Sequence, residues 1–87
     1  MNTYYNVYAI NGRTGRITAR TGAPDYDTAL HYACGLSIGA RTFQKSAFTA
    51  IYEAGGKLVH TCDYLSDYKP VSGTEAGLME AANRPNQ

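Results

Sequence analysis

The segment from Asp25 to Ile38 constrains the fold most, because it is the one long stretch of the chain with a clear helical stripe. We expect Asp25 or Asp27 to accept hydrogen bonds from the first turn, and Gly39 to end the helix. Small or apolar side chains share the side of Tyr26, namely Ala29, Leu30, Ala33, Cys34, Leu36 and Ser37. Such a side allows close packing, and a sheet is its natural cover.

A first hairpin is predicted over residues 4–21, where two alternating stretches flank the turn residues Asn11-Gly12-Arg13-Thr14-Gly15. The side chains expected against the helix are Tyr5, Val7, Ala9, Ile17, Ala19 and Thr21. The opposite face then presents tyrosines and arginines among polar residues: Tyr4, Asn6, Tyr8, Arg16, Thr18 and Arg20. Arg13 lies in the turn itself.

A second hairpin is predicted from residues 47–53 and 57–64, around Ala54-Gly55-Gly56. In the expected register Tyr52 faces Leu58, and the face that makes the better core holds Phe48, Ala50, Tyr52, Leu58, His60, Cys62 and Tyr64. The other face holds Thr49, Ile51, Val59, Thr61 and Asp63. A slip of one residue would exchange the two faces, and the sequence leaves this open.

These elements predict an α+β fold, in which a four-stranded antiparallel sheet of ββαββ order has one helix packed on one face. Residues 1–65 form this single domain, and residues 66–87 are an extension. The extension is either a short helix, capped by Thr74 with Leu78 and Met79 on the sheet, or a flexible tail. The second face of the sheet is expected to stay open to water or to a partner.

Charge and composition narrow the class of protein. The net charge of the 87 residues is +1, which argues against a strongly basic nucleic-acid binder and against an acidic DNA mimic. Residues 1–45 nevertheless carry +3 and residues 46–87 carry −2, so that one end of the molecule is expected to be basic. The N-terminal MNTYYNVYAI lacks the pattern of a signal peptide, and we expect a soluble, intracellular protein with reduced, at least partly buried cysteines.

The sequence predicts no catalytic, metal or cofactor site. A mixed zinc site could be imagined from His31, Cys34, His60 and Cys62, but their spacing fits no zinc pattern, and whether they approach one another is left open. No nucleophile is set beside a base in a recognisable arrangement, and the glycines of the first turn are explained by turn geometry. We expect no enzymatic activity and no small-molecule substrate.

Three stretches carry a resemblance to a known family: YYNVYAINGRTGRITAR, PDYDTALHYACG and FTAIYEAGGKLVHTCDY. In size, element order and surface the chain resembles small phage-encoded anti-CRISPR proteins that inhibit type I surveillance complexes. No shared motif is involved. The resemblance implies a stoichiometric inhibitor in the host bacterial cytoplasm that docks on Cas subunits, with contacts to guide RNA or target-strand phosphates.

We therefore expect a non-enzymatic binding protein, with no membrane contact, that inhibits a bacterial CRISPR-Cas nucleoprotein complex. The residues expected to bind the partner are Tyr4, Asn6, Tyr8, Arg13, Arg16 and Arg20. One alternative is a small RNA- or DNA-binding module that uses the same tyrosine and arginine face. Another is a self-associating structural protein in which Ile51 and Val59 meet across an open face or edge.

Overall fold

The computed structural model of the protein describes residues 3–43 and 46–82, which contain four strands and two helices. In chain order these are β1 (Tyr5–Asn11), β2 (Ile17–Ala23), α1 (Tyr26–Phe43), β3 (Ala47–Glu53), β4 (Leu58–Cys62) and α2 (Glu75–Ala82). The predicted α+β fold is confirmed. Of the two forms expected for the C-terminal extension, the described part contains the short helix. None of the described helices is both long enough and apolar enough to cross a bilayer.

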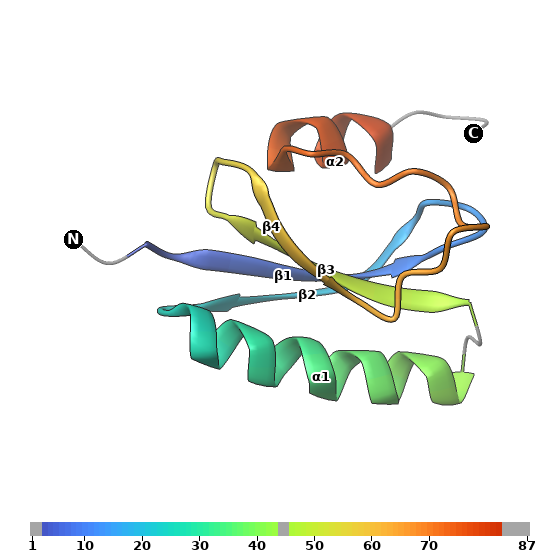
Figure 1. The fold of residues 1–87 in the computed structure, drawn as a ribbon, viewed down its shortest axis with the longest axis horizontal. Coiled ribbons are helices and arrows are strands. Elements are labelled where there is room, and N and C mark those ends of the chain that lie inside the picture. The colour runs from blue at the N-terminus through green and yellow to red at the C-terminus, as the bar shows by residue number, and fades with distance from the viewer. Residues whose placement is uncertain (1–2, 44–45, 83–87) are drawn as a thin grey trace.

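The strands form one antiparallel sheet in the order β2-β1-β3-β4, which places β1 and β3 at its centre. The two hairpins are therefore joined through their first strands, while β2 and β4 form the edges. The helix α1 lies along one face of the sheet, and α2 lies over the other (Figure 1). The segment that connects β4 to α2 passes the turn between β1 and β2.

The start of α1 is capped as predicted. The carboxylate of Asp25 accepts a hydrogen bond from the backbone N–H of Thr28 at 2.7 Å, and this bond holds the pKa of Asp25 below its usual value. The helix continues to Phe43, so the expectation that Gly39 ends it is wrong. A glycine inside a helix costs only about 1 kcal/mol relative to alanine, which is too little by itself to stop a helix packed on a sheet.

The core between α1 and the sheet is built from small helix residues. Ala29, Ala33 and Ser37 follow one another at intervals of four and are all buried. The buried members of this core are Val7, Ala23, Ala29, Ala33 and Ile51, with Tyr5, Leu30, Leu36, Val59 and Cys62 packed around them. The expectation that both cysteines are at least partly buried is wrong for Cys34, which is exposed on the outer side of α1.

A second core covers the opposite face of the sheet, so the expectation of an open face is wrong. Its buried members are Tyr8, Ile10, Phe48, Ala50, Tyr52, Tyr68 and Leu78. Tyr68 precedes α2 and Leu78 belongs to it. The C-terminal extension thus supplies side chains to this core, and the sheet carries apolar layers on both faces. Residues 83–87 of the extension lie outside the described part of the chain.

A β-bulge alters the first hairpin. Ala9 pairs with Ala19 but Ile10 pairs with Ile17, which leaves Thr18 as an extra residue on β2. Simple alternation predicts that Ile17 packs against α1. Because of the extra residue, Ile17 packs instead in the core beneath α2. The predicted facing of this strand is therefore wrong at its first residue.

A second bulge alters the other hairpin. Tyr52 pairs with Leu58, as predicted, but the next pair joins Ile51 to His60, and one residue of β4 is left over between them. His60 and Cys62 consequently lie on the α1 side of the sheet, where Cys62 packs in the core, and not with Tyr52. The predicted face is confirmed for β3 and wrong for the end of β4.

Candidate functional site

The turn of the first hairpin is fixed by the side chain of Asn11. Its Oδ1 atom accepts hydrogen bonds from the backbone N–H groups of Arg13 at 2.9 Å and Thr14 at 3.2 Å. The N–H of Gly15 donates to the Asn11 carbonyl at 2.7 Å, and Gly15 has a φ of 77°, where glycine is favoured. The turn therefore projects Arg13 from a rigid base.

Arg13 is exposed but engaged with the chain itself. Its guanidinium lies 3.1 Å from the carboxylate of Asp67, and its Cζ atom lies 5.7 Å from the centre of the Tyr68 ring. Both partners belong to the segment between β4 and α2. An exposed ion pair of this kind contributes about 0–1 kcal/mol, so a stronger acidic partner could take its place.

Arg16 and Arg20 are both exposed. Arg16 directly precedes the edge strand β2, and Arg20 belongs to it. Arg20 pairs with Tyr8 of β1 and therefore belongs to the face beneath α2. The bulge at Thr18 breaks the alternation between the two arginines, so they are not neighbours on one face as expected. The structure instead spreads their charge along the rim of the first hairpin.

Tyr8 and Asn6 are held by the first residue of α2. Tyr8 is 1% exposed, and its hydroxyl donates to Glu75 Oε2 at 2.5 Å. The amide of Asn6 donates to the same oxygen at 2.6 Å, while the other oxygen accepts from the N–H of Gly55 at 2.7 Å. Of the residues expected to bind a partner, Tyr8 is thus sealed inside the fold, and Asn6 is half-buried beside it.

The electrostatics of this cluster favour a charged Glu75. Burial, followed by the hydrogen bond to Glu75, raises the pKa of Tyr8 to about 12, and burial raises that of Tyr52 to about 12 as well. Partial burial of Glu75 opposes ionisation, but the hydrogen bonds from Tyr8, Gly55 and Asn6 outweigh it and hold its pKa below the usual value. The carboxylate therefore fastens α2 to the sheet as an anion.

Tyr4 remains accessible at the entry to β1. Its side chain is 52% exposed. Its hydroxyl lies over Gly22, where an added Cβ would be 2.2 Å from the tyrosine oxygen. Tyr4, Arg13, Arg16 and Arg20 are therefore the expected partner-binding residues that reach the surface.

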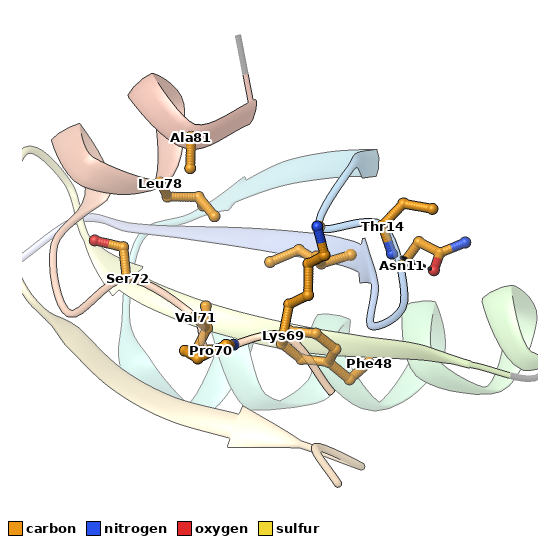
Figure 2. Close-up of a pocket in the computed structure, with 11 residues that line it drawn as sticks. Asn11, Thr14, Phe48, Lys69, Pro70, Val71, Ser72, Leu78 and Ala81 are labelled. Atoms are coloured by element: carbon orange, nitrogen blue, oxygen red, sulfur yellow. Dashed lines mark hydrogen bonds between the residues drawn. The ribbon is translucent and has the colours of Figure 1, made fainter. Parts of the chain in front are cut away.

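A small pocket lies between the turn of the first hairpin and the segment leading to α2. Figure 2 shows Leu78 and Ala81 of α2 above it and Phe48 of β3 below it. Lys69, Asn11 and Thr14 supply polar groups to its lining. Its volume is about 140 Å³, whereas sites for small molecules commonly measure roughly 300–1,000 Å³. The pocket is too small for an ordinary organic substrate.

The histidines and cysteines belong to two elements, α1 and β4. His31 and Cys34 are exposed on α1, while His60 and Cys62 lie in β4. In residues 3–43 and 46–82, no three His, Cys, Asp or Glu side chains gather in a group that could hold a metal ion.

Sequence reasoning missed the two residues that close the second face, Glu75 and Tyr68. The predicted cap was a usable signal, since Thr74 Oγ1 accepts a hydrogen bond from the N–H of Gly77 at 3.1 Å. Glu75 follows this cap in the first turn, where a carboxylate is favoured. Its contacts with β1, however, span 67 and 69 residues and leave no local pattern.

Comparison of the chain with family models, with curated proteins and with solved structures found no match.

Proposed function

We propose that the protein is a non-enzymatic binding protein that occupies a surface of a larger bacterial complex through its first hairpin. The observation that supports this most directly is the placement of Arg13, Arg16 and Arg20, three exposed cations around one hairpin of a nearly neutral chain. Arginine forms directed, paired hydrogen bonds with carboxylates and phosphates and is enriched in protein interfaces. The partner surface is accordingly acidic or phosphate-bearing.

Binding suits this geometry better than catalysis does. The groups whose pKa is shifted most, Tyr8 and Tyr52, are buried and donate structural hydrogen bonds, to Glu75 and to the Ser72 carbonyl. The pocket beside Lys69, of about 140 Å³, is too small for an ordinary substrate, and two larger hollows of about 310 and 380 Å³ are shallow and open to solvent. The exposed arginines of the first hairpin are better suited to a macromolecular surface.

The partner we propose is a bacterial CRISPR-Cas surveillance complex in the host cytoplasm. This choice rests on the resemblance in size and element order to phage-encoded inhibitors of such complexes. The arginines would pair with acidic side chains of a Cas subunit or with guide and target phosphates.

Each alternative loses one of the residues on which it depended, although Tyr4 and the three arginines remain exposed. A nucleic-acid module would stack bases on the sheet face, but Tyr8 is 1% exposed there. Self-association across an open face would need Ile51, which is completely buried beneath α1. Binding of free nucleic acid is kept as an outcome of the test, because arginines alone can follow phosphates.

The test is binding of the purified protein to a type I surveillance complex, with an assay of target-DNA binding alongside. We expect the double variant Arg16→Glu, Arg20→Glu to bind at least about 30-fold more weakly, corresponding to roughly 2 kcal/mol for a central arginine pair. The single variant Arg16→Glu guards against misfolding, since Glu at position 20 would lie near Glu75. Lys57→Glu is the matched control, because Lys57 is also exposed but lies in the other hairpin.

Unchanged binding and inhibition in both arginine variants would remove these residues from the function. Gel shifts with free RNA and DNA at two salt concentrations distinguish the proposed function from the nucleic-acid-binding alternative. Affinity that falls steeply with salt would favour a nucleic-acid-binding protein over a protein-directed inhibitor.

A further inference from the structure

The outer edge of β2 is an unused pairing surface. In an antiparallel sheet, alternate residues of an edge strand direct their N–H and C=O groups away from the neighbouring strand. Within residues 3–43 and 46–82, no backbone hydrogen bond reaches that side of β2. The other edge is different, because Leu58 of β4 donates to the Gly73 carbonyl at 2.8 Å and Lys57 bridges to Thr74. The fold therefore protects the start of β4 and leaves β2 available.

A shallow groove runs beside this edge, between β2 and α1. It is lined by Thr21 of β2 and by His31, Tyr32, Gly35 and Leu36 of α1. None of these residues is an acid, a lysine or an arginine, and Tyr32 is 40% exposed. The exposed side of a surface helix usually carries charged residues, so a groove without acids, lysines or arginines favours contact with apolar side chains.

Gly35 is the least expected residue of the groove. It lies in the interior of α1, where glycine is unfavourable relative to alanine. An added Cβ would meet no atom within 4 Å, so packing inside the molecule gives no reason for a glycine. Its absence of a side chain keeps the floor of the groove low.

The charges around β2 identify the occupant. Thr21 lies on the α1 side of the strand, and Arg20 lies on the opposite side. A strand added to β2 would alternate in the same way, with apolar side chains in the groove and its other side chains toward Arg20. Arg16 lies beyond the bulge and off the face of Arg20, and Arg13 is paired with Asp67, so Arg20 is the cation that faces this second set of side chains. Charge complementarity therefore favours an acidic residue opposite Arg20, which the nearby Glu75 carboxylate neutralises only in part.

We infer that the partner contributes an extended segment, in which acidic and apolar residues alternate, that pairs with the outer edge of β2 and fills the groove beside α1. This inference rests on the proposed function and names the chemistry of the partner. Main-chain pairing supplies affinity, and the groove and Arg20 supply specificity. A second copy is a poor occupant, because antiparallel pairing of two β2 strands centred on Arg20 would place the two Arg20 side chains opposite each other.

The experiment uses the full protein and a synthetic seven-residue peptide in which glutamate alternates with valine. A peptide with lysine in place of glutamate is the charge control. Binding is followed by amide chemical shifts and by titration calorimetry. We expect the glutamate peptide alone to bind, with the largest shifts in β2 and around Gly35.

The decisive variant is Gly35→Leu, which should stabilise α1 and raise the Tm by roughly 4–8 °C while filling the groove. We expect this variant to bind the glutamate peptide at least tenfold more weakly than the unchanged protein does. Gly73→Ala is the matched control, because a Cβ at Gly73 also meets nothing within 4 Å. It should leave peptide binding unchanged.

Four outcomes overturn the inference: no peptide binding, equal binding of the lysine peptide, equal binding by Gly35→Leu, or shifts away from β2. Pairing of β2 in a dimer, or displacement of the peptide by a single-stranded oligonucleotide, would equally assign the edge to another occupant. If Gly35→Leu still binds the surveillance complex but the arginine variants do not, the proposed function stands and this inference fails. If neither change affects the complex, both fail.

Discussion

Replacing Leu78 by alanine is expected to lower the free energy of unfolding by about 2–4 kcal/mol. Leu78 is 4% exposed and packs in the core beneath α2. Comparable buried truncations cost about 2–5 kcal/mol. We expect the lower part of that range, because Leu78 lines the pocket of about 140 Å³, which already offers space for water. Helix propensity does not add to the loss, since alanine is at least as favourable as leucine.

Urea unfolding followed by circular dichroism measures this change, with the m-value checked for constancy. The matched control is Leu65→Ala, the same truncation at a side chain that is 49% exposed, which should cost no more than about 0.5 kcal/mol. If both variants lose less than about 0.5 kcal/mol, α2 does not cover the sheet in solution. The second face would then be open, as the sequence alone predicts.

Acid should destabilise the protein through Glu75. Because its pKa is lower in the folded chain than the usual 4.5, the unfolded chain binds the proton more tightly, and stability falls as the pH drops below about 4.5. Unfolding of Glu75→Gln between pH 2 and pH 6 should show a shallower acid limb, and an unchanged limb would contradict the role of this carboxylate. Gly12→Ala should cost about 1–3 kcal/mol, since the added Cβ would lie 2.3 Å from Tyr68 Cγ. A neutral effect in chemical denaturation would show that Tyr68 does not pack on this turn.

The element order could be predicted because it depends on local chemistry. Asn11 and Gly15 fix one turn and Gly55 the other, and Asp25 caps α1. The repeat of small residues on α1 identified the side that packs on the sheet. Each of these signals lies within a few residues of the feature that it predicts.

The candidate site depended on contacts that have no local signal. The alternation of the first strand predicts that Tyr8 lies on an exposed face. In the structure, Glu75 and Leu78 cover it. The bulges at Thr18 and in β4 add one residue each without a glycine or proline to mark them, and each reverses the facing beyond it. The arginines were identified correctly as exposed residues, but their arrangement along the edge of β2 required the register.

The wide separation between Tyr8 and its cover affects how the chain is made. Glu75 emerges 67 residues after Tyr8, a delay of roughly 3–13 s at ordinary rates of translation. During that interval the first hairpin has neither Glu75 nor Leu78 to cover Tyr8 and Ile10. A nascent chain stalled before α2 would therefore expose an apolar sheet surface that chaperones or other nascent chains can bind.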